Sequence, residues 1–193
     1  MKIKLTIAFL FLLVASTSIA QNYKIDAGHS LVQIQVERFG VVDVSGRFKA
    51  VEGNIQYDAE NPQGTNASAI IKVDSYDANN KGGEDAVKSP AFLDAAKYPE
   101  ISFTGISTQV KDGKNYLKGN LTIHGETQMI ELPYTIKGPA LDLPTQKQSI
   151  AFNAAITINR QDYGLTFDRR WTNGVSLVSN DVKINLLILA IAE

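Results

Sequence analysis

The sequence of 193 residues predicts an all-β fold, in which the antiparallel strands of one domain close into a small barrel. The first observation is an alternation of apolar and polar side chains along most of the chain, which is typical of strands with one buried face. The second is a reversal of this alternation at two points, which indicates bulges that bend a sheet. Strong bending favours a closed barrel over a flat sandwich.

Four stretches show the alternation most clearly, and each is long enough for a strand. In the first of them, Val32, Ile34 and Val36 face one way while the polar residues between them face the other. The expected strand at 175–190 ends in a nearly continuous apolar run, so we expect it to be covered on both faces. The four alternating stretches are residues 30–37, 115–123, 128–136 and 148–158.

The alternation reverses its phase at two places, and each reversal predicts a bulge. Phe48 lies on the even-numbered face of its stretch, whereas Val51 and Ile55 lie on the odd-numbered face, so we expect a bulge near residues 50–52. The apolar positions change from odd to even across Gly105, which predicts a second bulge there. Glycines and bulges at such positions curve a sheet into a barrel.

Residues 79–99 interrupt the β pattern and predict a short helical insertion near residues 84–96. Residues 83–88 are expected to make one helical turn. Ser89 followed by Pro90 is typical of an N-cap and of the first position of a second short helix. A helix between barrel strands either covers one mouth of the barrel or packs against its outside, and the sequence leaves both alternatives open.

The first 20 residues have the three parts of a secretory signal peptide. Lys2 and Lys4 form a basic start, residues 5–14 are almost continuously apolar, and small side chains precede an expected cleavage point before Gln21. The apolar run is shorter than the roughly 20 residues that span a bilayer, so we expect no stable membrane anchor. An N-terminal anchor and a buried helix are the alternatives. The sequence therefore predicts one domain at 21–193 in a periplasmic or secreted protein.

Composition disfavours several functional classes. Without Lys2 and Lys4, 17 of the 19 Lys and Arg remain against 20 Asp and Glu, a net charge of −3, so we expect no nucleic-acid partner. The chain has no cysteine, and its two histidines lie 95 positions apart, so we expect no metal site. No phosphate-binding glycine loop is present, and we expect no cofactor.

Asp26, His29 and Ser30 have the residue types of a nucleophilic triad, but adjacent residues at a strand entrance point to opposite faces. We therefore expect no catalytic residue. The charged residues between the last two expected strands form either a solvated loop with Arg–Asp pairs or a polar rim that meets a ligand's head group. Arg160, at the end of an apolar strand, is the strongest candidate for such a contact.

Six segments of the chain carry a family resemblance. They are Tyr23-Lys24-Ile25-Asp26, Val44-Ser45-Gly46-Arg47-Phe48, Ser89-Pro90-Ala91-Phe92-Leu93-Asp94, Tyr98-Pro99-Glu100-Ile101-Ser102-Phe103, Gly119-Asn120-Leu121-Thr122-Ile123-His124-Gly125-Glu126-Thr127 and Ile158-Asn159-Arg160-Gln161-Asp162-Tyr163-Gly164-Leu165. Each segment alone is weakly specific. In their order and spacing they resemble the YceI-like family of bacterial lipid-binding proteins, over the whole chain after the signal peptide.

The resemblance implies an eight-stranded antiparallel, lipocalin-like barrel with a long apolar tunnel for a polyisoprenoid or another long-chain amphiphile. It also implies export and no catalytic residues. We expect the inward-facing apolar side chains to line the tunnel, together with one phenylalanine of the helical insertion. The candidate lining residues are Val32, Ile34, Val36, Phe48, Phe92, Phe103, Leu121, Ile123, Phe152 and Ile156.

Three charged residues are candidates for contact with a ligand's polar head group. Many members of the family carry a histidine eight residues before the glycine that matches Gly46, and this chain has Arg38 there. A permanent cation in place of an imidazole favours phosphate or carboxylate ligands. Asp85 and Arg160 complete the candidate polar contacts.

The expected function is to hold or carry a long-chain apolar ligand such as a polyisoprenoid, an isoprenoid quinone or a fatty amide. The protein is expected to act as a monomer or homodimer. One alternative is a protein-binding module that acts through its surface and has a filled core. Another is an enzyme acting on such a lipid, which needs an acid or base facing the tunnel, and the apolar faces contain almost none.

Overall fold

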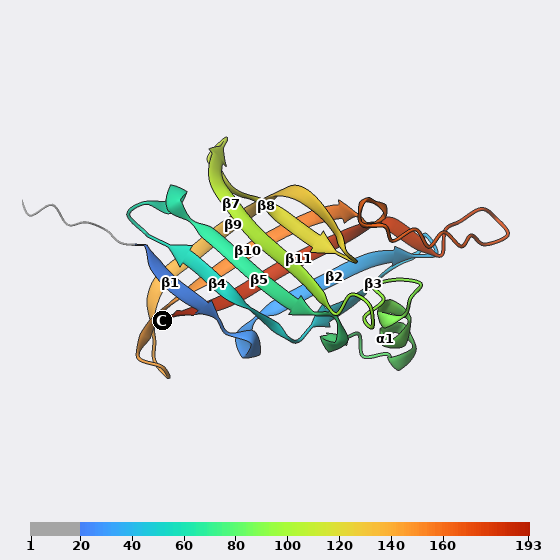
Figure 1. Ribbon diagram of the computed structural model, residues 1–193, viewed down its shortest axis with the longest axis horizontal. Coiled ribbons are helices and arrows are strands. Elements are labelled where there is room, and N and C mark those ends of the chain that lie inside the picture. The colour runs from blue at the N-terminus through green and yellow to red at the C-terminus, as the bar shows by residue number, and fades with distance from the viewer. Residues whose placement is uncertain (1–19) are drawn as a thin grey trace, which may run out of the picture.

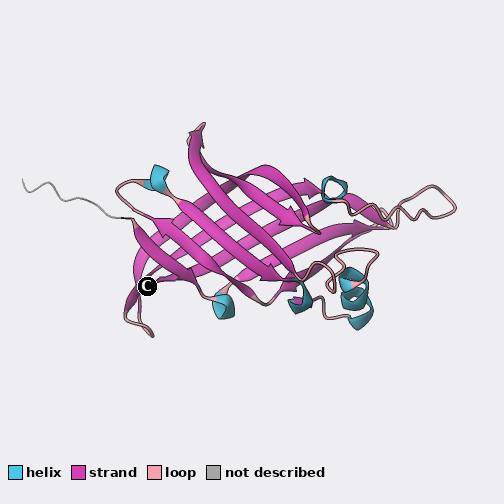
Figure 2. Ribbon diagram, in the orientation of Figure 1, coloured by secondary structure: helices cyan, strands magenta, loops and turns pink. Residues whose placement is uncertain are grey.

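A computed structural model describes residues 20–193, which form an elongated barrel (Figure 1). The predicted signal peptide lies outside the described residues except for its last position. One α-helix, α1 (Lys81–Lys88), and four short 3-10 helices accompany the strands (Figure 2). Between residues 20 and 193 no helix is long and apolar enough to cross a membrane. The strands are β1 (Gln21–Ile25), β2 (Leu31–Arg38), β3 (Val42–Phe48), β4 (Val51–Tyr57), β5 (Asn66–Lys72), β6 (Tyr76–Asp77), β7 (Glu100–Lys111), β8 (Lys114–Ile123), β9 (Glu126–Asp142), β10 (Lys147–Asn159) and β11 (Val178–Ala192), and the 3-10 helices are η1 (Ala27–His29), η2 (Pro62–Gly64), η3 (Val73–Ser75) and η4 (Arg160–Tyr163).

Eight strands close into the barrel, and neighbouring strands are antiparallel throughout. The order β1-β4-β5-β7-β8-β9-β10-β11 returns to its start because β11 also pairs with β1, where Tyr23 lies opposite Ala192. Closure satisfies the backbone hydrogen bonds of strands that would otherwise form exposed edges. The predicted all-β fold, an eight-stranded antiparallel barrel with a short helical insertion, is therefore confirmed.

Three further strands lengthen the barrel at the end that carries α1. β2 follows β1 along the same edge of β11, β3 pairs with β2, and β6 pairs with β3. β6 is the last strand of this extension, and α1 follows it in the chain (Figure 1). The helical segment therefore lies where the extended sheet ends.

One predicted bulge is confirmed, and the other is a break between two strands. The register of β7 against β8 shifts between Gly105 and Ser107, which is the bulge predicted at Gly105. At the other position, β3 ends at Phe48 and β4 starts at Val51, and the two strands pair with different neighbours. Both of these side chains are buried, because the change of phase turns each of them toward the interior.

The outer face of β11 is only partly covered, contrary to the prediction from its apolar run that both faces are covered. Leu187 exposes 52% of its surface, and Leu189 and Ile191 are only half-buried. Their inward-facing neighbours Ile188 and Ala190 are buried. The apolar run therefore has one face inside the barrel and one outside, as alternate residues of a strand must.

The helical insertion begins and ends earlier than predicted. The side chain of Asn80 accepts a hydrogen bond from the backbone N–H of Gly83 and caps the start of α1. Ser89 is the C-cap of this helix, and its N–H donates to the carbonyl of Ala86 at 3.1 Å. The predicted second helix after Ser89 is wrong, because the chain folds back in turns, with Asp94 in the left-handed conformation at φ 47°.

The barrel end opposite α1 is filled by its own side chains. Tyr23, Tyr134 and Ile150 are buried there, and the ring of Tyr134 stacks on Phe152 with centroids 5.0 Å apart. The hydroxyl of Thr108 lies 3.2 Å from the hydroxyl of Tyr134 and is therefore positioned to hydrogen-bond with it. Because these side chains are buried and the Tyr134 hydroxyl has a polar partner there, they close this end of the barrel.

Glycines opposite two aromatic side chains allow strands to carry large rings inside the barrel. A Cβ at Gly119 would lie 2.5 Å from the ring of Phe103, and a Cβ at Gly46 would lie 2.3 Å from the hydroxyl of Tyr76. Real Cβ atoms do not approach other atoms so closely. The absence of a side chain at Gly119 and Gly46 therefore makes room for Phe103 and Tyr76.

We expect Gly119→Ala to lower the free energy of unfolding by about 1–3 kcal/mol, because the added methyl overlaps Phe103 and the carbonyl of Thr104. Gly82→Ala in α1 is the matched control, since its nearest neighbouring atom lies 3.6 Å away and alanine favours a helix. Urea denaturation of both variants measures the difference. Equal stability of the Gly119 variant and the unchanged protein would contradict this close packing.

Candidate functional site: a cavity inside the barrel

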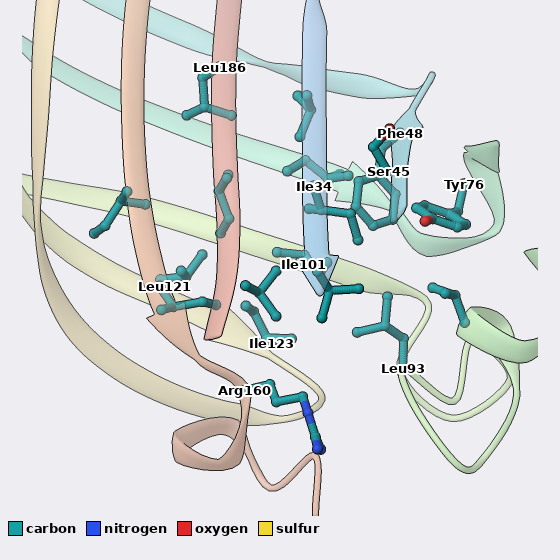
Figure 3. A pocket seen from close by; sticks show the side chains of 18 of the residues that line it. Ile34, Ser45, Phe48, Tyr76, Leu93, Ile101, Leu121, Ile123, Arg160 and Leu186 are labelled. Atoms are coloured by element: carbon teal, nitrogen blue, oxygen red, sulfur yellow. The ribbon is translucent and has the colours of Figure 1, made fainter. Parts of the chain in front are cut away.

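The barrel encloses a cavity of about 890 Å³ in the part of its interior nearest α1. Side chains from β2, β7, β8, β10 and β11 form much of its wall. Figure 3 shows Ile34, Leu121 and Leu186 approaching the same space from different strands, with Arg160 at the edge of the group. The volume lies within the range of about 300–1,000 Å³ that is typical of small-molecule sites. The core of the barrel is therefore not filled, whereas the alternative of a protein-binding module that acts through its surface assumed a filled core.

All ten apolar residues predicted to line the interior lie on the wall of this cavity. They are Val32, Ile34, Val36, Phe48, Phe92, Phe103, Leu121, Ile123, Phe152 and Ile156. Their contact with a ligand stays a prediction. Sequence reasoning missed other wall residues, although extending the same alternation along each apolar face would have found them. These include Ile101, Leu117, Leu132, Ile184, Leu186 and Ile188.

The segment that contains α1 lies over the barrel mouth. Ala86 and Val87 of the helix line the cavity, as do Phe92 and Leu93 of the turns that follow. The ring of Phe92 packs against Phe167, which precedes β11, with centroids 4.9 Å apart. The sequence left two positions open for the helical insertion. The structure shows that it covers the mouth of the barrel and does not pack against the outside.

Few polar residues line the cavity, and the two charged ones among them are cations. The polar residues are Ser45, Ser68, Tyr76, Asn80, Arg38 and Arg160, of which Ser45 and Ser68 are exposed residues that alternate with the inward-facing positions of their strands. Burial raises the pKa of Tyr76, so its hydroxyl stays protonated. No Asp, Glu or His is among the described residues of the wall. The site is therefore an apolar chamber with cationic groups and no acidic counterpart.

Arg160 is a buried cation held by backbone carbonyls. Its side chain is 3% exposed. Nε donates to the carbonyl of Ser179 at 3.0 Å, Nη2 donates to Phe167 at 2.6 Å, and Nη1 donates to the carbonyl of Leu165. No carboxylate in the described chain forms an ion pair with it, and burial lowers its pKa. The guanidinium therefore joins η4, the loop after it and the start of β11 in one hydrogen-bonded unit.

Arg38 lies at the end of β2, on the other side of the start of β11. Its cross-strand partner is Val178, the residue before the Ser179 carbonyl that accepts from Arg160. The guanidinium of Arg38 is 4.3 Å from the ring centroid of Phe39, within the range of a cation–π contact. Two of the three predicted polar residues therefore lie near each other at the barrel mouth.

Asp85, the third predicted polar residue, does not line the cavity, and this part of the prediction is wrong. Because α1 begins at Lys81, Asp85 lies one turn later on the same helix face and pairs with the Lys81 ammonium at 3.2 Å. Its side chain is exposed, whereas Val87 packs against the core. Asp85 therefore has no place in the candidate site.

The Asp26, His29 and Ser30 group is a surface turn. His29 Nδ1 lies 2.7 Å from Asp26 Oδ2, and this hydrogen bond raises the pKa of His29 and lowers that of Asp26. The Ser30 hydroxyl donates to the backbone carbonyl of Asp26 at 2.6 Å. The serine therefore bonds to the backbone and not to the imidazole, so the contact between nucleophile and base that a triad requires is missing from this turn.

The amino-acid sequence of this chain is similar to those of known proteins. A family model described as the YceI-like domain matches residues 23–190. A UPF0312 protein of Pseudomonas putida is 33% identical over 159 residues, covering 80% of this chain and 81% of that protein. A Salmonella heidelberg protein named YceI is 29% identical over 159 residues, covering 81% of this chain and 83% of its own length.

Solved structures share the same barrel. BcnA of Burkholderia cenocepacia superposes with a TM-score of 0.74 and 23% identity, covering 86% of this chain and 99% of its own. A YceI protein of Campylobacter jejuni has a TM-score of 0.68 and 26% identity, covering 79% of this chain and 87% of its own. A polyisoprenoid-binding domain from Saccharophagus degradans has a TM-score of 0.66 and 15% identity, covering 89% of this chain and 98% of its own.

We expect Arg160→Met to lower the free energy of unfolding by about 3–5 kcal/mol, because it leaves buried carbonyls without their donor. Arg169→Met is the control, since Arg169 is exposed and the change is expected to stay within about 0.5 kcal/mol. Urea denaturation compares the two. Similar small losses of stability in both variants would show that the hydrogen bonds of Arg160 do not hold η4, the loop after it and β11 together.

Proposed function

We propose, from the premise that this chain belongs to the YceI-like domain family, that it binds a long-chain apolar molecule inside its barrel and holds or carries it. The observation that carries the proposal is the 890 Å³ cavity, whose wall is almost entirely aliphatic and aromatic. The likeness to a polyisoprenoid-binding domain supports a polyisoprenoid as one ligand class. Isoprenoid quinones and fatty amides are further candidates, because they too join a long apolar chain to a polar end.

The size of the cavity fits a chain of moderate length. If each heavy atom takes about 30 Å³, the share of a water molecule in the liquid, the cavity holds roughly 30 heavy atoms. Burying one five-carbon unit is worth about 4 kcal/mol, at about 0.8 kcal/mol for each carbon. Several units would exceed the limit of about −21 kcal/mol seen for non-covalent binding, so the cost of ordering the chain must offset much of this gain.

Binding is favoured over catalysis by the chemistry of the wall. General acid–base catalysis needs a titratable group with a pKa near the working pH and within reach of the substrate. The described wall offers two arginines and a tyrosine, and these keep their protons at neutral pH. We therefore propose a binding protein that needs no cofactor, with the lipid itself as its ligand.

Arg38 and Arg160 are proposed to interact with the polar end of that ligand. Both line the cavity at its mouth, and guanidinium groups donate hydrogen bonds but accept none. Three of the five N–H groups of Arg160 are engaged by backbone carbonyls, which leaves its charge to act on the chamber. The head group that suits this end is one with acceptor oxygens, such as a quinone carbonyl, a phosphate or a carboxylate.

The protein is proposed to act outside the cytoplasm. The basic start, apolar run and small residues of positions 1–20 are those of a cleaved signal peptide, which supports export to the periplasm or beyond. A protein in that compartment that encloses a lipid shields it from water during storage or transfer between membranes. The oligomeric state proposed for it is a monomer or homodimer.

We expect lipid to co-purify with the protein and to be lost from a variant whose cavity is filled. Leu121→Trp places a larger side chain in the wall, and we expect at least a tenfold lower content of extractable lipid, measured by mass spectrometry of the organic extract. Leu187→Trp is the control, because Leu187 faces outward from β11. Equal lipid content in both folded variants, or none in the unchanged protein, would overturn the proposed function.

Arg38→Ala is expected to weaken the binding of an acidic ligand more than that of a neutral one. Retinoic acid and retinol are suitable probes, since they share a polyene chain and differ in the head group. We expect about a fivefold loss for the acid, near 1 kcal/mol, and little change for the alcohol, measured by fluorescence titration. Unchanged affinity for both would remove Arg38 from the site.

A further inference from the structure

Two loops at the α1 end of the barrel expose large apolar side chains to solvent. Val41 is 83% exposed and Val42 53% exposed at the turn between β2 and β3. Trp171, the single tryptophan of the chain, is 62% exposed in the loop that leads to β11. In Figure 1 this loop projects beyond the strands, at the end of the molecule away from the C-terminus.

These loops form one surface. The backbone N–H of Phe39 donates to the carbonyl of Leu177 at 3.1 Å, which ties the β2–β3 turn to the second loop. A Cβ at Gly40 would lie 3.4 Å from Val175, so the two loops are in contact there as well. Phe39, Trp171 and Val175 surround a shallow hollow of about 270 Å³. We call residues 38–42 and 168–177 together the apolar tip.

The apolar tip adjoins the mouth of the cavity. Phe39 borders the shallow hollow and also lines the large cavity, and Leu177 lines the cavity from the second loop. The opposite end of the barrel is filled by Tyr23, Tyr134 and Ile150. A long-chain ligand therefore has its shortest route into the cavity at the end that carries the tip.

The tip combines this apolar surface with cations. Neither Arg38 nor Arg169 has a carboxylate within ion-pair distance in the described chain. The acidic side chains of the same region are balanced locally, because Asp168 pairs with Arg170 at 3.3 Å and Asp43 pairs with Lys183 at 2.8 Å. Glu37 also lies in the field of Lys183.

Exposed tryptophan and valine beside arginine match the chemistry of a membrane surface. Tryptophan favours the boundary between head groups and acyl chains, and arginine attracts anionic head groups. The tip also projects from the barrel, as a group that enters a bilayer must. An interface with another protein needs a partner surface of complementary shape. Another exposed apolar turn, around Leu143, lies at the closed end of the barrel, far from the cavity mouth.

We propose that the protein docks on a lipid bilayer through the apolar tip, with Val41 and Trp171 entering the boundary between head groups and acyl chains and Arg38 and Arg169 facing anionic lipid head groups. Docking in this orientation brings the cavity mouth to the membrane, so that a ligand passes between bilayer and barrel without crossing water. The direction of this transfer rests on the proposed function, whereas docking itself rests on the tip alone.

Trp171 reports on docking directly, because the chain has no other tryptophan. Vesicles of phosphatidylethanolamine and phosphatidylglycerol are added to the protein, and the fluorescence of Trp171 is followed together with co-sedimentation. We expect a shift of the emission to shorter wavelength and quenching by lipids brominated along the acyl chain. Vesicles of phosphatidylcholine alone are expected to bind several-fold more weakly.

Val41→Asp is the test variant, and Leu143→Asp is its matched control at the closed end, where Leu143 is 72% exposed. We expect Val41→Asp to lower the partition into anionic vesicles by about tenfold or more, because a carboxylate replaces an inserted valine. Leu143→Asp is expected to leave it unchanged. Both positions are exposed, so neither substitution removes a core contact.

Three results overturn the inference. The first is no change in Trp171 fluorescence with anionic vesicles, and the second is an equal loss of vesicle binding in the Val41 and Leu143 variants. The third is a shift of Trp171 fluorescence on binding another protein but not on adding vesicles. Lipid extraction from the same preparations separates this inference from the proposed function. If the protein contains lipid but does not bind vesicles, docking is refuted and the proposed function is not. Docking by a protein that never contains lipid supports the tip and refutes the carrier.

Discussion

The pairing of β1 with β11 is the constraint on which the rest of the structure depends. It covers three residue pairs, from Tyr23 opposite Ala192 to Ile25 opposite Ala190, yet it turns a curved sheet into a closed ring. Once the ring is closed, every strand must place alternate side chains inside it, and their packing must suit the circumference of eight strands. The filled end and the hollow end both follow from which side chains the strands deliver to each place.

Among residues 20–193, Arg160 is the one deeply buried cation, and a low-polarity interior makes such a charge costly unless hydrogen bonds stabilise it. Arg160 meets this condition with backbone carbonyls and without a carboxylate, so its positive charge is solvated by dipoles but not cancelled. Because the carbonyls come from a loop and from the start of β11, the same bonds give the rim of the chamber its shape. The hydrogen bonds of Arg160 therefore both order the rim of the chamber and hold a positive charge there.

Much of the barrel and its wall could be predicted because a period of two directly reports which side chains face inward; the inward position of Ile34 and Phe152 follows from alternation alone. Features that depend on distant partners could not. Ser89 carries the signal of a helix start, but the preceding helix uses it as an end. The outward direction of Asp85 depends on a helix that begins at Lys81. The carbonyls around Arg160 meet it only in the folded chain.

The chamber has a fixed depth, because Phe152 in its wall stacks on Tyr134, and the space beyond is filled by Tyr134, Tyr23 and Ile150. Under the proposed function, a chain that enters tail first stops before this filled end, and its head group lies near the arginines only if the tail has the matching length. Shorter tails leave part of the aliphatic wall without contacts, and longer ones leave carbons in water. For such a ligand, the depth of the chamber selects among chains that differ only in length.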